Sequence, residues 1–387
     1  MISENTRSIK NSKIRDMFNL ALQYENPVNL TIGEPDFAVS DDVADAACKA
    51  IMEGKTKYSE NAGVLPLRQK ISRYLEEELD LSYDPKKEIT VTTGAMGALF
   101  LTLKTIIDPG DQVIVNEPCW TNYMQQIMMC GGTPVSVGVK ADFSIDVRAI
   151  SEAVNEKTKA VILNSPCNPT GSIMEKEDLE KLADAMKDTN ALVISDEVYK
   201  HLCFGETQFH SMAAIPGMKE RTVVIDSFSK SHAMTGFRIG YAAGPEEVIS
   251  NITKLQENMT ACVSMPSQYA AIAALDGDRS HLNRMVETYR ARRDYIMEKT
   301  EEIPFLSCAM PKGAFYAFLD IRDTGMGSEE FSIKLLEEKQ IVVVPGTAFG
   351  EQGEGYIRLS FAASMDKLEL GMEGIKRFII ENARNAR

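Results

Sequence analysis

Short apolar runs recur along the middle of the chain, and stretches with helical periodicity separate most of them. Each run is rich in valine and isoleucine and too short for a helix, which is typical of buried strands. This alternation indicates the α/β class, with a mostly parallel sheet of about seven strands between helices. The expected strands cover residues 89–92, 112–115, 134–139, 160–163, 192–195, 222–225 and 239–242.

The pattern changes on either side of this region. The first 27 residues have the apolar spacing of one short amphipathic helix, which we expect to pack rather than to catalyse. A domain boundary is expected near residue 281, with a large domain before it and a smaller α+β domain over 282–387. Helices are expected at 41–53, 64–79, 282–300, 329–338 and from 365, and strands of the smaller domain at 314–320, 341–344 and 356–361.

The composition narrows the choice of partners. The 387 residues include 42 Lys and Arg and 56 Asp and Glu, which gives a net charge of -14. This negative charge argues against nucleic acid as the main partner. No apolar run reaches the roughly 18 residues of a membrane span and the first residues lack a signal-peptide layout, so we expect a cytoplasmic protein. The cysteines form no C-x-x-C pair and the histidines have no ligand spacing, so we expect no metal site.

Polar and aromatic residues follow four of the expected strands, at the sheet edge where such folds bind ligands. Residues 93–99 are small and open a helix, so their free N–H groups suit a phosphate. Their spacing fits neither a P-loop nor G-x-G-x-x-G. The other three strand ends are followed by residues 116–120, which include the only tryptophan, by 164–171 and by 196–199.

Lys230 follows a further expected strand, and the residues after it are mostly apolar or uncharged. No residue in the next seven positions is Asp, Glu, Lys or Arg. A lysine in such surroundings is either paired with an acid or works as a neutral nucleophile with a lowered pKa. Its immediate neighbours leave both interpretations open.

Three motifs, taken together and in chain order, carry a family resemblance. They are Asn-Pro-Thr-Gly from residue 168, Ser-Asp-Glu-Val-Tyr from 195, and Ser-x-Ser-Lys-x-x-x-Met-Thr-Gly-x-Arg-Ile-Gly-Tyr from 227. Over nearly the whole chain the sequence resembles the class I aminotransferases of fold type I, the aspartate and aromatic aminotransferase family, which use pyridoxal 5'-phosphate. The resemblance implies that Lys230 holds this cofactor as a Schiff base and then acts as general acid and base.

The same resemblance assigns contacts to the cofactor ring. Asp196 would partner the pyridine nitrogen, while Tyr199 and Asn168 would hydrogen-bond O3′. Trp120 would stack on the face of the ring. Without the resemblance Asp196 fits a helix-capping acid equally well, Tyr199 and Asn168 fit a packed tyrosine and an Asn-Pro turn, and a sole tryptophan is more often part of a core.

A second group would hold the cofactor phosphate. Arg238 matches the arginine that pairs with it, helped by the hydroxyls of Ser227 and Ser229 and by the backbone N–H groups of Ala95 and Met96. Outside this context Arg238 would be an ordinary surface cation.

The resemblance also assigns the substrate site. Arg358 interrupts an apolar strand and matches the arginine that grips the substrate α-carboxylate, with the Gly33 backbone, Trp120 and Asn168 beside it. Residues 1–38 would then join the small domain, leaving 39–281 as the cofactor-binding domain, and the small domain would close over substrate. Tyr58 resembles the residue that reaches the neighbour's cofactor phosphate, which implies a homodimer.

Met96 departs from the pattern of relatives built for acidic substrates, which carry a lysine there. Losing this cation removes a partner for a second carboxylate, so we expect a neutral or apolar amino acid, with transfer to a 2-oxo acid by a ping-pong mechanism.

Two other functions remain open. One is a pyridoxal-phosphate carbon-sulfur β-lyase on the same fold, although the lyases compared often have histidine where Tyr199 stands. The other is the aminotransferase-like sensor domain of a transcription regulator. Such regulators carry a DNA-binding domain ahead of the fold, and little chain precedes Gly33.

Overall fold

The computed structural model has the expected seven-stranded sheet, in the order β2-β8-β7-β6-β5-β3-β4. It describes residues 2–9 and 11–385. Strands β3 to β7 run parallel, whereas β8 is antiparallel to both β2 and β7. The strands are β2 (Ile89–Thr92), β3 (Gln112–Glu117), β4 (Thr133–Gly138), β5 (Thr158–Asn164), β6 (Leu192–Asp196), β7 (Thr222–Ser227) and β8 (Gly240–Ala243).

Helices cover both faces of this sheet. They are α3 (Asp41–Met52), α4 (Leu65–Leu79), α5 (Gly94–Ile106), α6 (Asn122–Met129), α7 (Val147–Ala153), α8 (Lys176–Met186), α9 (Phe228–Ser231), α10 (Glu246–Thr260) and α11 (Met265–Asp276). In β3, Val113 and Val115 pack with α5, α6 and α10, whereas Ile114 packs with α7 and α8. Alternate side chains of a strand point to opposite faces, so the apolar runs of the sequence serve two cores.

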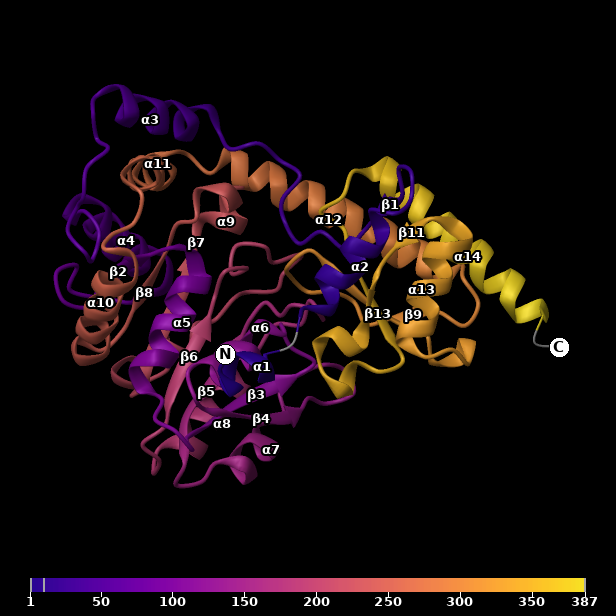
Figure 1. Cartoon of the computed structure of the whole chain (residues 1–387), viewed down its shortest axis with the longest axis horizontal. Coiled ribbons are helices and arrows are strands. Elements are labelled where there is room, and N and C mark those ends of the chain that lie inside the picture. Colours follow the sequence, from indigo (N-terminus) through magenta and orange to yellow (C-terminus); the bar gives the residue numbers. More distant parts are fainter. Residues whose placement is uncertain (1, 10, 386–387) are drawn as a thin grey trace.

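The C-terminal part forms a second sheet of four strands, in the order β12-β13-β10-β9. Three helices pack with it around one apolar core that includes Tyr289, Phe315 and Phe378. Figure 1 shows these orange and yellow elements beside the central sheet, with α12 extending toward them. The elements are α12 (Ser280–Glu301), β9 (Ser307–Cys308), β10 (Tyr316–Asp320), α13 (Ser328–Lys339), β12 (Val344–Pro345), β13 (Tyr356–Ser360) and α14 (Met365–Asn385).

The N-terminal segment lies against this C-terminal part. Strand β1 (Val28–Asn29) pairs in parallel with β11 (Ile341–Val342), and the Ser360 backbone N–H donates to the Leu30 carbonyl at 2.8 Å. Instead of one helix, this segment has α1 (Glu4–Ser8) and α2 (Lys13–Ala21), because the chain is extended at Ile9. Within the described ranges, no helix is both long enough and apolar enough to cross a membrane.

The prediction of a single strand at 341–344 was wrong in one respect. It is two short strands, β11 and β12, which pair with different partners, β1 and β13. Val343 lies between them, where the chain passes from one sheet to the other. A run of apolar residues predicts burial but carries no information on which strand will be the partner, so the split was not visible in the sequence.

Candidate active site

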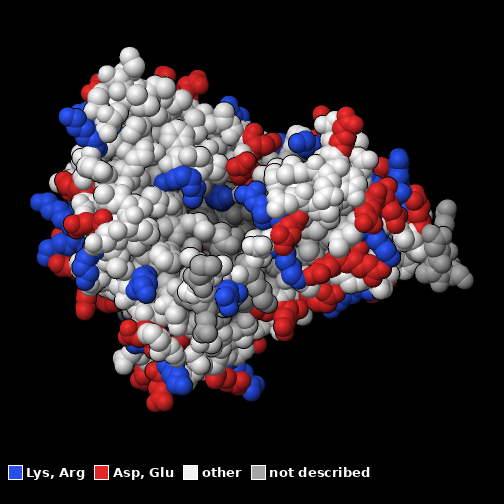
Figure 2. All heavy atoms as spheres, viewed as in Figure 1, with Lys and Arg blue, Asp and Glu red and all other residues white. Residues whose placement is uncertain are grey.

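A cavity of about 360 Å³ lies at the carboxyl ends of the central strands, next to the C-terminal sheet. Figure 2 shows a hollow near the middle of this face of the molecule, with basic side chains around it. The cavity wall contains every site residue predicted from the sequence except Tyr58. These residues are Gly33, Ala95, Met96, Trp120, Asn168, Asp196, Tyr199, Ser227, Ser229, Lys230, Arg238 and Arg358.

Asp196, the last residue of β6, places a buried carboxylate in the cavity wall. The Tyr123 hydroxyl donates to its Oδ2 at 2.6 Å, and the Val198 backbone N–H donates to its Oδ1 at 3.3 Å. Burial raises the pKa of Asp196 to about 6, against the hydrogen bond from Tyr123, which lowers it. An N–H⁺ group facing this carboxylate would find a strong acceptor.

Lys230 lies on the short helix α9. Its Nζ donates to the Gly33 carbonyl at 2.6 Å and lies 5.7 Å and 5.6 Å from the ring centres of Tyr199 and Phe315. Burial lowers the pKa of Lys230 to about 8; Glu34 opposes this change and Arg238 adds to it. The amine is therefore closer to its neutral, nucleophilic form than an ordinary lysine.

A further group of lining residues, near the start of α5, suits a phosphate group. Helix α5 begins there with the backbone N–H groups of Ala95 and Met96, and the hydroxyls of Ser227 and Ser229 lie in the same wall. Gly94 has a φ of +70°, and a Cβ on it would lie 2.8 Å from an Arg238 guanidinium nitrogen. Glycine at this position thus allows Arg238 to reach the start of α5.

Arg358 forms a separate cationic site and is only 2% exposed. Its Nη2 donates to the Thr31 carbonyl at 2.7 Å, and its guanidinium carbon lies 4.3 Å from the Tyr316 ring centre and 4.8 Å from that of Phe349. Nε is buried without a hydrogen-bond partner. A buried guanidinium in a cavity wall is suited to a carboxylate ligand.

Several wall residues were missed in the sequence. The Tyr316 hydroxyl shares a hydrogen bond of 2.9 Å with the Tyr199 hydroxyl, but Tyr316 lies in an apolar strand that gave no signal. Tyr123 and Glu34 could have been suspected only because they are close in sequence to the predicted site residues Trp120 and Gly33. Ile14, from the helix expected only to pack, also lines the cavity, as do Thr31, Asn164, Val198 and Thr235.

Tyr58 does not line the cavity of its own chain. Its side chain is 88% exposed. The loop that carries it is held by the Ser59 backbone N–H, which donates to Cys262 Sγ at 3.4 Å, and by Gln268 Nε2, which donates to Ser59 Oγ at 3.2 Å. Tyr58 therefore lies outside the cavity that the other predicted site residues form.

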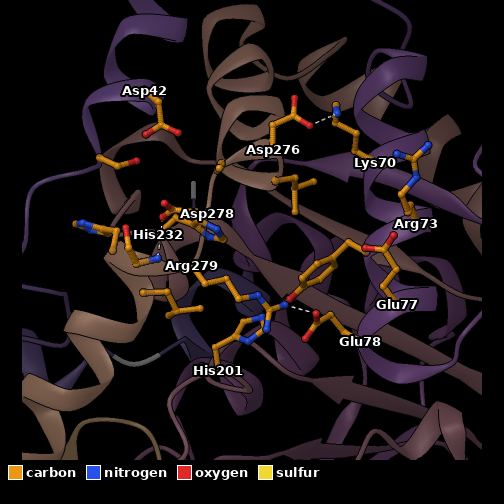
Figure 3. Close-up of a pocket in the computed structure, with 18 residues that line it drawn as sticks. Asp42, Lys70, Arg73, Glu77, Glu78, His201, His232, Asp276, Asp278 and Arg279 are labelled. Carbon is orange, nitrogen blue, oxygen red and sulfur yellow. Dashed lines mark hydrogen bonds and ion pairs between the residues drawn. The ribbon is translucent and has the colours of Figure 1, made fainter.

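A second cavity, of about 490 Å³, lies where α4 meets the junction of α11 and α12. Figure 3 shows His201 and His232 among the charged residues that line it, and ion pairs join Lys70 to Asp276 and Arg279 to Glu78. None of the site residues predicted from the sequence is in its wall.

Comparisons with known proteins agree with this geometry. Residues 25–374 match the family described as Aminotransferase class I and II. The chain is 38% identical to the aspartate aminotransferase of Pyrococcus abyssi, over 98% of both chains. The crystal structure of Pyrococcus protein-A1 is similar with a TM-score of 0.96 at 38% identity, covering 98% of this chain and 99% of that one. The aromatic aminotransferase of Pyrococcus horikoshii OT3 has a TM-score of 0.90 at 38% identity, over 96% and 99%.

The chain therefore belongs to the class I and II aminotransferase family. It is an aminotransferase of fold type I that depends on pyridoxal phosphate, so the predicted family, fold and cofactor are confirmed. The residues present fit this cofactor, because the lining of one cavity offers a buried carboxylate, donors for a phosphate and the Lys230 amine.

Proposed function

We propose that the protein moves an amino group from an L-amino acid to a 2-oxo acid in two successive half-reactions at Lys230. The observation that carries this proposal is the Lys230 amine, whose pKa is lowered to about 8, in one cavity with Asp196 and the buried guanidinium of Arg358. A covalently acting amine, an acceptor for a ring N–H⁺ and a carboxylate site are the groups that this reaction requires.

When bound, pyridoxal phosphate supplies a ring that takes up the electron pair released as the substrate Cα loses its proton. Lys230 would hold the cofactor covalently until the substrate amino group displaces its Nζ, and the freed amine could then take the proton from Cα and deliver a proton to the cofactor carbon C4′. Asp196 would keep the ring nitrogen protonated, and Tyr199 and Asn168 would donate hydrogen bonds to O3′. Trp120 would cover the face of the ring.

The remaining roles concern anions. Arg238, the Ser227 and Ser229 hydroxyls and the N–H groups of Ala95 and Met96 bind the phosphate. Arg358 binds the substrate α-carboxylate, beside the Gly33 backbone, Trp120 and Asn168. The place of Arg358 supports this assignment, because its buried guanidinium lines the cavity and a bound carboxylate would balance its charge.

For the substrate we propose a neutral or apolar amino acid. The cavity contains three cations among its described lining residues, Lys230, Arg238 and Arg358, and each has a role above. Met96 occupies the position of a further cation, and its Sδ accepts from Asn122 Nδ2 at 3.3 Å. The relatives named above include an aspartate and an aromatic aminotransferase, so family membership does not fix the side chain.

The elimination of a β substituent is the alternative outcome, because it starts from the same loss of the Cα proton. The hydrogen bond between Tyr199 and Tyr316 holds a hydroxyl in the cavity. The family resemblance implies that lyases of this fold often have histidine in place of Tyr199, which favours transamination. Product analysis separates the two outcomes, since elimination releases ammonia and an oxo acid without converting the cofactor to its amino form.

We further propose that the protein works as a homodimer in which Tyr58 reaches the neighbouring phosphate site. Tyr58 is exposed near the ends of α3 and α10, where Ile51, Met52 and Met259 are 53%, 86% and 45% exposed. Apolar side chains exposed together on a surface are typical of a protein interface.

Two further proposals concern the domains and the location of the protein. The pairing of β1 with β11 supports a small domain built from residues 1–38 and 282–387, which closes over the large domain 39–281 when substrate binds. The seven free thiols support a cytoplasmic location.

The covalent role of Lys230 is tested by reducing the cofactor-loaded protein with borohydride, digesting it and weighing the peptides. The cofactor is expected on the peptide that contains Lys230, and a Lys230→Ala variant should give no adduct. An adduct on the variant at an unchanged level would reject the assignment.

A further inference from the structure

Two buried charges lie directly behind the candidate active site and have no role in the reaction proposed above. Lys200 Nζ and Asp226 Oδ2 are 2.8 Å apart, and their side chains are only 2% and 8% exposed. Lys200 follows Tyr199 in the turn after β6, and Asp226 precedes Ser227 at the end of β7. The ion pair therefore joins the two strand ends that carry Asp196, Tyr199, Ser227, Ser229 and Lys230.

Both carboxylate oxygens of Asp226 take part in this connection. Oδ1 accepts from the Ser227 backbone N–H at 2.7 Å, and Oδ2 accepts from the Tyr241 hydroxyl at 2.8 Å as well as from Lys200. Burial and the charge of Asp226 raise the pKa of Tyr241, which keeps its hydroxyl a donor. Asp226 thus ties β6, β7 and β8 together at one point.

A layer of side chains separates the ion pair from the second cavity. The Tyr74 ring centre lies 4.8 Å from Lys200 Nζ, and the Tyr74 hydroxyl hydrogen-bonds His201 Nε2. Tyr74 and His201 line that cavity, in which Figure 3 shows His201. Burial acts to lower the pKa of Lys200, but Asp226 and the neighbouring hydroxyls raise it well above its ordinary value. Lys200 therefore stays charged in a dry environment.

Stability alone does not account for such a pair. Removing two charges from water costs about as much as their attraction returns, and apolar side chains of similar volume often stabilise a protein equally well. A pair of fixed charges does supply directional contacts, which apolar side chains cannot. These contacts end on the residues next to Tyr199 and Ser227.

We propose that Lys200 and Asp226 are positioning residues, which fix the spacing between Tyr199 on one strand end and Ser227 on the next, and with it the fit of the cofactor ring and phosphate. This inference rests on the proposed function, in which Tyr199 contacts the ring and Ser227 the phosphate. Loss of the pair should therefore weaken and reorient bound cofactor even where the fold is intact.

The test uses the double variant Lys200→Met/Asp226→Leu, which replaces the pair by apolar side chains. The matched control is Lys187→Met/Asp184→Leu, which removes an exposed ion pair of 2.9 Å on the surface. Three quantities are measured on each protein: the urea midpoint without cofactor, the dissociation constant for pyridoxal phosphate, and the pH midpoint of the visible absorbance of bound cofactor.

We expect the double variant to keep the wild-type urea midpoint, to bind pyridoxal phosphate about tenfold more weakly and to shift the pH midpoint by about half a unit. The control should match the wild type in all three. A folded double variant with wild-type affinity and pH midpoint would overturn the inference. A wild type that itself forms no covalent complex with pyridoxal phosphate would instead reject the proposed function.

If the double variant does not fold, the variant Tyr241→Phe tests the inference instead. It removes one hydrogen bond to Asp226 and leaves both charges in place. We expect it to fold normally, with a shifted pH midpoint and about threefold weaker cofactor binding. An unchanged pH midpoint and affinity in this variant would likewise overturn the inference.

Discussion

Arg358 Nη1 donates a hydrogen bond of 2.9 Å to Asn168 Oδ1, across 190 positions of the chain. This bond links the C-terminal sheet to the loop after β5, so the proposed carboxylate site is held in place before any substrate arrives. Pre-oriented donors lower the cost of binding because little ordering remains.

Replacing Arg358 by lysine should weaken substrate binding selectively. A lysine keeps the charge but loses the paired donors of the guanidinium, so KM for the amino acid is expected to rise about a hundredfold while cofactor affinity stays near wild type. Steady-state kinetics and a cofactor titration measure the two effects. Arg290→Lys, at an exposed ion pair with Glu287, is the control and should change neither. Equal losses of cofactor and substrate binding would contradict the assignment.

Lys230→Met should stabilise the cofactor-free protein at neutral pH. The pKa of Lys230 is about 8 in the folded protein against 10.5 ordinarily, so below pH 8 the folded state carries a buried charge that methionine lacks. The variant is expected to unfold with about 2 kcal/mol more free energy at pH 7.

This advantage has a defined pH window. Between pH 8 and 10.5 the unfolded wild type binds more protons than the folded one, so its stability rises relative to the variant and the difference should vanish. Urea unfolding across this range measures it. A difference that stays constant from pH 7 to 10.5 would show that the lysine pKa is not lowered.

Met96→Lys should move the preference toward acidic substrates. The new cation would face a second carboxylate, and the ratio of kcat/KM for aspartate to that for alanine is expected to rise about tenfold or more. Met96→Leu keeps an apolar side chain and should leave this ratio unchanged. An unchanged ratio in the lysine variant would reject the substrate proposal.

A shared active site predicts complementation between two defective chains. Tyr58→Ala should weaken cofactor binding and Lys230→Ala should abolish activity, because each removes one contribution to a composite site. In a heterodimer, the site with an intact Lys230 receives an intact Tyr58 from the other chain. Co-expressed chains should therefore recover activity at a cofactor concentration too low for Tyr58→Ala alone; no recovery would place Tyr58 outside the neighbouring site.

The parts of the site carried by strand ends could be predicted from the sequence. Asp196 and Lys230 come within a few residues of the ends of short apolar runs, so their position at the edge of the sheet is a consequence of local pattern and parallel topology. Tyr316 could not be found this way, because it lies inside an apolar strand and meets Tyr199 only after the C-terminal sheet has packed. The ion pair of Lys200 and Asp226 is similar, since each residue has an oppositely charged residue closer in sequence than its actual partner.

The most direct test of the central claim is a half-reaction. Protein loaded with pyridoxal phosphate is mixed with a panel of amino acids in the absence of any acceptor, and the cofactor spectrum and released products are quantified. Transamination through Lys230 predicts conversion to the pyridoxamine form with oxo acid stoichiometric with subunits, and no conversion in Lys230→Ala. Continuous release of ammonia and pyruvate with no pyridoxamine form would contradict the account.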